Sequence, residues 1–197
     1  MLHNVLKDQT IILASSSPRR KEILNMLGLS FKVLVSDIDE PITDDEPQLQ
    51  AMMHAENKAM CIAKLSKPVE LVVAADTIVV LDGKILGKPV DAFQAREYLS
   101  ILSGRDHLVY TGICTVKAGR VFRAFSESKV EFACLSMQEI EDYVSTEEPM
   151  DKAGAYGIQG FGAQFITRIE GCYFNVMGFP VQTFYSLIKQ MRDEALI

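Results

Sequence analysis

The stretch Leu71-Val-Val-Ala-Ala-Asp-Thr-Ile-Val-Val-Leu81 is apolar at nearly every position and carries one carboxylate near its centre. A valine-rich run of this length, without polar alternation, is typical of a strand covered on both faces. A carboxylate in such a strand is costly unless it is paired or bound to a metal. We therefore expect Asp76 to be either half of a structural ion pair or a functional group, a base or a magnesium ligand.

The segments before this strand alternate between strand and helix patterns. Ser17 followed by Pro18 indicates a helix start, and Gly28 indicates its end. The predicted order is a strand at 10–15, a helix at 17–28, a strand at 31–35, an acidic loop at 37–46 and a helix at 48–65.

The segments after the strand add hairpins to this pattern. Asp91 with Gln94, and Ser136 with Glu139, have the spacing of capping boxes that start helices. The remaining predictions are a hairpin of 109–116 with 121–130, strand or hairpin structure at 165–176, and a final helix from Pro180. Together they predict a mixed α/β fold, a long twisted sheet flanked by helices, in a single domain over 1–197.

Composition and charge narrow the class of protein. The chain has 197 residues and a net charge of −6, which disfavours a nucleic-acid polymer as partner but leaves room for a small anionic ligand. The four cysteines form no CxxC pair, which is typical of reduced intracellular thiols. The N-terminal residues are too polar for a signal peptide, and no apolar run is long enough to cross a membrane. We expect a cytoplasmic protein without a membrane partner.

The segment Ser15-Ser-Ser-Pro-Arg-Arg20 is a candidate anion site. Free N–H groups and the positive dipole end make the N-terminus of a helix attractive to phosphate. The positive charges of Arg19 and Arg20 are unfavourable at the positive end of the helix dipole, so their presence needs another explanation. Binding of phosphate is one, because guanidinium groups donate paired hydrogen bonds to phosphate oxygens. The alternative is an ordinary capped helix with two surface arginines.

A glycine-rich stretch runs from Lys152 to Gly160 and fits neither a Walker A loop nor a dinucleotide-binding fingerprint. Its glycines permit tight turns or close approach to a ligand. Within it, Tyr156 is able to stack on a base, and Gln159 is able to read a base edge through its amide. His107, in a strand setting, is better explained as a structural histidine than as a catalytic one.

Taken in order, these pieces resemble the Maf family of nucleoside triphosphate pyrophosphatases, also called septum-formation inhibitor proteins. The resemblance covers nearly the whole chain. The matching segments are Ala14-Ser-Ser-Ser-Pro-Arg-Arg20, Asp39-Glu40, Asn57-Lys-Ala59, Ala75-Asp-Thr77, Leu86-Gly-Lys-Pro89, Leu102-Ser-Gly-Arg-Asp-His107, Tyr110-Thr-Gly112, Asp151-Lys-Ala-Gly-Ala-Tyr-Gly-Ile-Gln-Gly160 and Asn175-Val-Met-Gly-Phe-Pro180.

The resemblance implies a two-lobed fold similar to Maf and Ham1 proteins, with the active-site cleft between the lobes. It also implies cleavage between the α and β phosphates of a nucleotide, with Mg²⁺ or Mn²⁺ as cofactor. By this resemblance, Asp76 is the proton acceptor, and Glu40 and Asp76 are the metal ligands. The substrate-binding residues carried over are Ser15, Arg19, Arg20, Lys58, Thr77, Lys88 and Gln159.

Within the family, the combination of Arg19, Thr77 and Gln159 is similar to the type that cleaves dTTP and UTP. Two alternatives stay open: a 7-methyl-GTP pyrophosphatase of the same family, and a non-catalytic nucleotide-binding regulator of cell division. The sequence is compatible with both a monomer and a homodimer.

Overall fold

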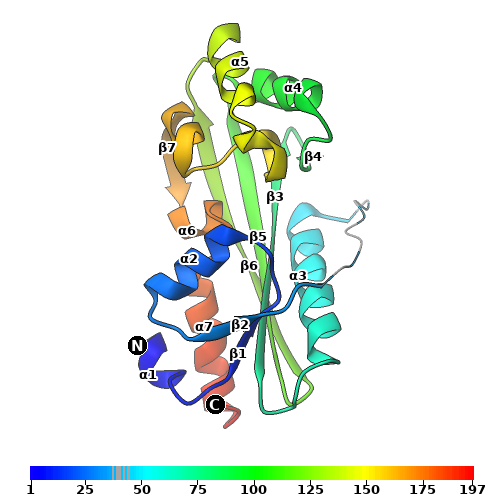
Figure 1. Cartoon of the computed structure of the whole chain (residues 1–197), viewed down its shortest axis with the longest axis vertical. Coiled ribbons are helices and arrows are strands. Elements are labelled where there is room, and N and C mark those ends of the chain that lie inside the picture. The colour runs from blue at the N-terminus through cyan, green and yellow to red at the C-terminus, as the bar shows by residue number, and fades with distance from the viewer. Residues whose placement is uncertain (37, 39–40, 42, 44) are drawn as a thin grey trace. The chain divides into compact units, whose positions relative to one another are not determined.

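The computed structural model describes residues 1–36, 38, 41, 43 and 45–197 (Figure 1). The chain divides into two compact units, in agreement with the two lobes that we expected. The first unit comprises residues 1–76, 111–126 and 178–197, and the second comprises 77–110 and 127–177.

The strands form a mixed sheet, as predicted, which has seven strands within the described residues. Its order is β2-β1-β3-β5-β6-β7, and β4 pairs with β3 off this path. β1 runs parallel to β2 and to β3, whereas β4 and β7 are antiparallel to their partners β3 and β6. The strands are β1 (Ile11–Leu13), β2 (Phe31–Val33), β3 (Leu71–Leu81), β4 (Lys84–Leu86), β5 (Asp106–Lys117), β6 (Arg120–Phe132) and β7 (Ile166–Gly171).

The helices begin largely where the local signals place them. Ser136 and Glu139 form the predicted capping box at the start of α5. Asp91 caps α4 by accepting a hydrogen bond from the Gln94 backbone, while the Gln94 side chain accepts one from the backbone of Val90. The helices are α1 (Leu2–Val5), α2 (Pro18–Met26), α3 (Pro47–Ala63), α4 (Ala92–Leu102), α5 (Met137–Ser145), α6 (Tyr173–Val176) and α7 (Val181–Asp193), with 3-10 turns η1 (Glu148–Asp151), η2 (Ala153–Ala155) and η3 (Gly160–Phe165).

One predicted element is partly wrong, and several short ones were missed, namely β4, α1 and the three 3-10 turns. Residues 165–176 were expected to be extended throughout, but the strand β7 ends at Gly171 and the helix α6 follows. The chain turns at Gly171, whose φ of +123° is in the region that favours glycine. The three-residue strand β4 and the four-residue helix α1 are too short to carry a periodic pattern, and neither was predicted.

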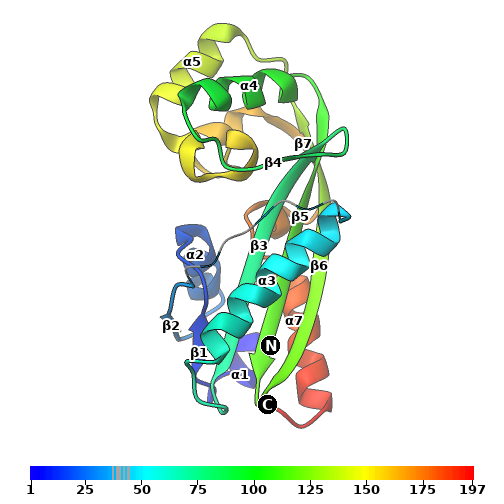
Figure 2. The same ribbon diagram turned by 90° about the vertical axis from the view of Figure 1, so that its right-hand side faces the viewer.

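In the first unit, α3 covers one face of the sheet and α7 covers the other (Figures 1 and 2). Alternate residues of β5 show this directly. Cys114 and Val116 pack in one buried cluster with Ala55, Ala59 and Ile62 of α3. Thr115, between them, donates a hydrogen bond from its hydroxyl to the sulfur of Met191 on α7. The burial on both faces that we predicted for the strand at 71–81 is confirmed as well, since only Thr77 of β3 is less than fully buried.

The helix α3 lies unusually close to β5. Ala51, Ala55 and Ala59 recur every four residues, so they share one face of the helix, and all three are fully buried. Opposite them is Gly112, where a Cβ atom would lie 2.2 Å from the carbonyl oxygen of Ala51. Because that obstacle is helix backbone, a side chain at Gly112 would force α3 away from the sheet.

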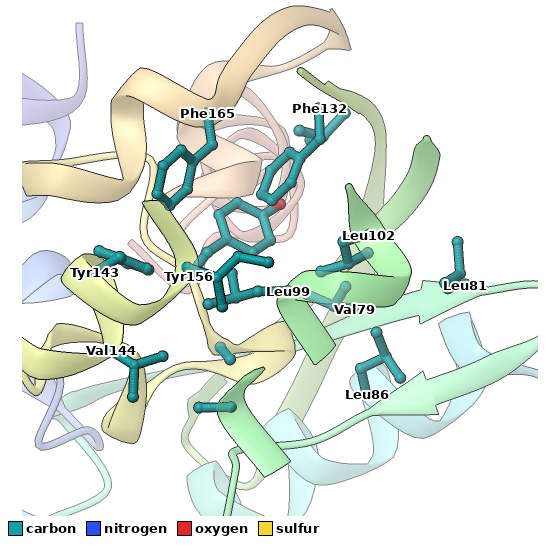
Figure 3. Packing of buried hydrophobic residues seen from close by; sticks show 14 of the residues in the cluster. Val79, Leu81, Leu86, Leu99, Leu102, Phe132, Tyr143, Val144, Tyr156 and Phe165 are labelled. Atoms are coloured by element: carbon teal, nitrogen blue, oxygen red, sulfur yellow. The ribbon is translucent and has the colours of Figure 1, made fainter. Parts of the chain in front are cut away.

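The second unit has its own core, in which several aromatic rings pack among aliphatic side chains (Figure 3). The ring centroids of Phe132 and Tyr156 lie 4.7 Å apart, and those of Tyr143 and Phe165 lie 5.0 Å apart. Both pairs pack edge to face. Leu99 and other apolar side chains of α4 and β3 complete the cluster. Each unit therefore buries apolar surface of its own.

Two expectations from composition can also be compared with the structure. All four cysteines, each within the described part of the chain, are free thiols, as expected. Over the same residues, the structure contains no helix with the length and apolar character that a membrane crossing requires.

We expect Gly112→Ala to destabilise the protein by about 1–3 kcal/mol, because the added methyl group overpacks the contact between α3 and β5. Urea unfolding followed by circular dichroism measures the change. Gly87→Ala is the matched control, since no atom lies within 4 Å of a Cβ built at that position. Equal stability of the two variants would contradict the close-packing argument.

Candidate active site around Asp76

The carboxylate of Asp76 lies on the side of β3 that faces α3. Val72 and Ala74, four and two residues before it, pack in the buried cluster with Ala55 and Ala59 of α3. Because side chains alternate between the two faces of a strand, Asp76 points to the same side. Only 5% of Asp76 is exposed, so its charge has little contact with solvent.

Two side chains of α3 bind the two oxygens of this carboxylate. Lys58 donates a hydrogen bond from Nζ to Oδ1 at 2.6 Å, and Nδ1 of His54 lies 3.2 Å from Oδ2. His54 is itself buried, with 4% of its side chain exposed. The cost of burying the Asp76 charge is thus offset by a cation and a second hydrogen-bond partner.

These contacts decide the protonation state of Asp76. Burial by itself would raise the pKa of this carboxyl, but the hydrogen bond with His54 and the positive charges of Lys58 and Arg20 outweigh it. The pKa of Asp76 is lowered to about 2. Asp76 is therefore a carboxylate at neutral pH, surrounded by positive charge.

His54 was not among the residues selected from the sequence. Its Nε2 lies 3.1 Å from the carbonyl oxygen of Pro41, so both ring nitrogens face an oxygen atom. A backbone carbonyl and an ionised carboxylate can only accept hydrogen bonds, so a ring with N–H groups at both nitrogens satisfies both contacts. A signal was present in the sequence: His54 precedes Lys58 by four residues and hence lies on the same face of the helix.

Ser15 and Arg20 are joined to each other at the start of α2. The hydroxyl oxygen of Ser15 accepts hydrogen bonds from Nη1 of Arg20 at 2.9 Å and from the backbone of Ser17 at 3.2 Å. Arg20 also donates from Nε to the carbonyl of Gly178 at 2.8 Å. Arg20 is 9% exposed, so it is not the surface arginine of the alternative interpretation. Its charge lies close enough to Asp76 to lower the pKa of that group.

The structure thus brings four of the predicted site residues, Ser15, Arg20, Lys58 and Asp76, into one group within the first unit. Arg19 is half-buried beside them on α2. The second unit contains the others: Thr77, which follows Asp76 on β3, the exposed Lys88 and the half-buried Gln159. Glu40, the second predicted metal ligand, lies outside the described residues.

The glycine-rich stretch of the second unit is organised by Glu148. One carboxylate oxygen accepts hydrogen bonds from the Tyr143 hydroxyl and the Gly162 backbone, and the other accepts from the Phe161 backbone. At Gly160, φ is +75° and a Cβ atom would lie 2.5 Å from Oε2 of Glu148, so only glycine fits. This carboxylate anchors the turn that directly follows Gln159.

The suggestion that Tyr156 stacks on a base is wrong for this structure. Tyr156 is 5% exposed and packs against Phe132 in the second core (Figure 3). Its hydroxyl lies 2.7 Å from Nε2 of His107. Its ring faces are used by the core. His107, 3% exposed and held by this contact, has the structural role that we expected.

Comparison with known proteins identifies the family. The Maf family, described as Maf-like protein, matches residues 10–191, and the chain therefore belongs to this family. Similar proteins include the dTTP/UTP pyrophosphatase of Caldanaerobacter subterraneus subsp. tengcongensis, 45% identical over 91% of this chain and 88% of its own. The dTTP/UTP pyrophosphatase of Pyrococcus abyssi is 48% identical over 91% of this chain and 95% of its own.

Among solved structures, the Staphylococcus aureus Ham1 protein has a TM-score of 0.46 to this chain, at 17% identity over 80% of each chain.

His107 makes the stability of the protein depend on pH. Burial lowers the pKa of His107 from 6.5 to about 4. Between these two values the unfolded chain binds a proton at His107 that the folded chain does not, so stability falls as the pH is lowered through this window. Urea unfolding should show a loss on the order of 2 kcal/mol between pH 7 and pH 4.5 from this group.

The His107→Gln variant should lack this part of the pH dependence, whatever its stability at pH 7. His3→Gln, which changes an exposed histidine on α1, should retain it. Parallel curves for wild type and His107→Gln between pH 4.5 and pH 7 would contradict the assignment.

Proposed function

We propose that this protein hydrolyses dTTP and UTP to the nucleoside monophosphate and pyrophosphate. The observation that carries the proposal is the buried, ionised Asp76, held by Lys58 and His54 and near Arg20. Membership of the Maf family and relatives named dTTP/UTP pyrophosphatase support the choice of reaction and substrate. In this proposal the chain is a single cytoplasmic domain over 1–197 that removes nucleotides from the cellular pool.

The first unit supplies the groups that bind phosphate. The guanidinium of Arg20 and the ammonium of Lys58 are cations, and the hydroxyl of Ser15 is an additional polar group at the start of α2. Donors of this kind neutralise the charge that develops on a leaving pyrophosphate. Lys88, which is exposed in the second unit, is the further cation that the proposal assigns to the phosphates.

Asp76 is the proposed proton acceptor for the attacking water. With a pKa of about 2 it is always ionised at neutral pH, but it is a weak base as long as its cations face it. Phosphate oxygens compete for Lys58 and Arg20, and each cation that turns toward the substrate raises the basicity of Asp76. Binding of the triphosphate thus makes the carboxylate a better base at the time when a base is needed.

A divalent cation fits the chemistry of this site. Mg²⁺ is usually bound by one or two carboxylates together with phosphate oxygens, so it needs few ligands from the protein. Asp76 offers one carboxylate, and Glu40 is the second one that we propose. Among the described residues there is no group of three acidic, histidine or cysteine side chains that could hold a metal. A bound Mg²⁺ or Mn²⁺ would offset the repulsion between the carboxylates and the triphosphate.

Selection of the base is assigned to Arg19, Thr77 and Gln159. Thymine and uracil present one N–H group between two carbonyl oxygens, and a side-chain amide is able to match this edge. A polar site built for that edge discriminates strongly, because a purine leaves its groups unpaired. Glu148 anchors the turn that follows Gln159, and these contacts fix the backbone next to Gln159.

The first test is Asp76→Asn, measured as pyrophosphate release from dTTP in the presence of Mg²⁺. The amide keeps the shape of the side chain but is not a base, so we expect turnover to fall by on the order of 10²-fold or more. Asp193→Asn, at the exposed end of α7, should have the activity of the wild type. Circular dichroism confirms that both variants are folded, and near wild-type turnover of folded Asp76→Asn would remove this residue from the mechanism.

The second test is a panel of all common NTPs and dNTPs. We expect dTTP and UTP to be cleaved on the order of 10²-fold more efficiently than purine nucleotides. Gln159→Leu should reduce this preference, whereas Gln164→Leu, an exposed control in the same region, should not. Equal rates on purines would contradict the pyrimidine assignment, preference for 7-methyl-GTP would favour that alternative, and binding without cleavage would favour a regulator.

A further inference from the structure

We infer that Gln50 and His54 are positioning residues that hold Pro41, Thr43 and Asp45 of the acidic loop in place relative to Asp76. This inference rests on the proposed function only for its effect on the reaction. In the mechanism above, neither side chain binds the phosphates or the nucleobase. Their proposed role is to keep the carboxylate of Asp76 and the loop in the geometry that the reaction needs.

The inference begins with the spacing of polar residues on α3. Gln50, His54 and Lys58 follow one another at intervals of four, so they form one stripe along the helix. Each of them directly precedes one of the buried alanines Ala51, Ala55 and Ala59, which form a stripe of their own on the helix. The alanines bring the helix close to the sheet, and the polar stripe beside them therefore lies near Asp76.

Gln50 is bound to the loop by three hydrogen bonds. Its Oε1 accepts from the Thr43 backbone at 3.1 Å, and its Nε2 donates to the carbonyl oxygens of Thr43 at 2.9 Å and of Asp45 at 2.7 Å. The side chain is 1% exposed. A buried amide whose donors and acceptor are all directed at the backbone of one loop fixes that backbone rather than a ligand.

His54 joins the same loop to the catalytic carboxylate. Its Nε2 contacts the carbonyl oxygen of Pro41 and its Nδ1 contacts Oδ2 of Asp76. One rigid ring thus links two positions that are 35 residues apart in sequence, the distance from 41 to 76. Glu40, the second proposed metal ligand, directly precedes Pro41 in the sequence. We therefore expect loss of the contact at Pro41 to raise the Mg²⁺ concentration that the reaction requires.

Three substitutions at His54 separate the two contacts. The amide nitrogen of Asn takes the place of Nδ1, so His54→Asn keeps a donor for Asp76 and loses the one for Pro41. Conversely, the amide nitrogen of Gln takes the place of Nε2, so His54→Gln keeps the donor for Pro41. His54→Leu has neither, and Gln50→Leu removes the other attachment of the loop.

Amide hydrogen exchange of the peptide that contains Thr43 and Asp45 reports on the loop without substrate or metal. We expect exchange there to be at least about 10-fold faster in His54→Leu, His54→Asn and Gln50→Leu than in wild type, and close to wild type in His54→Gln. His3→Leu, at an exposed histidine of α1, is the control that should change nothing. Unchanged exchange in both Gln50→Leu and His54→Leu would overturn the inference.

Steady-state pyrophosphate release and its dependence on Mg²⁺ measure the consequence for the reaction. Loss of the loop attachment should lower kcat/KM by about 10- to 100-fold in His54→Asn, with a higher Mg²⁺ requirement. In His54→Gln, which keeps the donor for Pro41, the Mg²⁺ requirement should be that of the wild type. A merely structural role of the ring would not predict this difference between the two variants. Faster exchange with unchanged kcat/KM would overturn the positioning role. A wild-type protein that releases no pyrophosphate would refute the proposed function and leave the exchange result as the test of the loop contacts.

Discussion

The burial of one charge, that of Asp76, determines much of the surrounding structure. An ionised carboxylate removed from water needs several partners, and removing one of them commonly costs a few kcal/mol. Here the partners come from different segments: Lys58 and His54 from α3, and the positive charge of Arg20 from α2. Each of these segments must be held at a short distance from β3, and this requirement explains features that have no chemistry of their own.

The small residues at the contact between α3 and the sheet are the main example. The alanine stripe of the helix and Gly112 on β5 let the two backbones approach closely, which places a lysine ammonium 2.6 Å from the carboxylate. On the other segment, the Gly178 carbonyl and the Ser15 hydroxyl orient the guanidinium of Arg20. Packing in the first unit is thus the means by which positive charge is concentrated around Asp76.

The same charges connect stability with function. Without a ligand they stabilise the carboxylate and make it a poor base, and with a triphosphate they have a second anion to bind. In the proposed mechanism, the carboxylate is held by its cations in the absence of substrate and becomes a better base when a triphosphate draws these cations away. The second unit has a separate core and anchors the turn after Gln159 through Glu148, so Gln159 depends on other contacts than those that hold the carboxylate.

Much of this protein could be predicted from local patterns in the sequence. Local signals predict the buried strand at 71–81, the hairpin of 109–116 with 121–130 and the caps at Asp91 and Ser136, and the structure confirms them. The sequence also singled out Asp76, because a charge in an apolar strand is unusual wherever it occurs. The order of its motifs determined the family.

What only the tertiary structure decided depends on contacts between distant segments. Whether Asp76 is paired, and with what, rests on side chains 18 and 22 residues away that a helix brings back to the strand. For the same reason His54 was overlooked and Tyr156 was misjudged. The spacing of His54 and Lys58 places both on one face of a helix but does not show that this face meets a carboxylate, and nothing near Tyr156 in sequence places it inside a core. The sequence by itself determined which groups are present and which segments carry them. The packing of α3 on the sheet decided which of them meet, since charge compensation acts through distance in space and not along the chain.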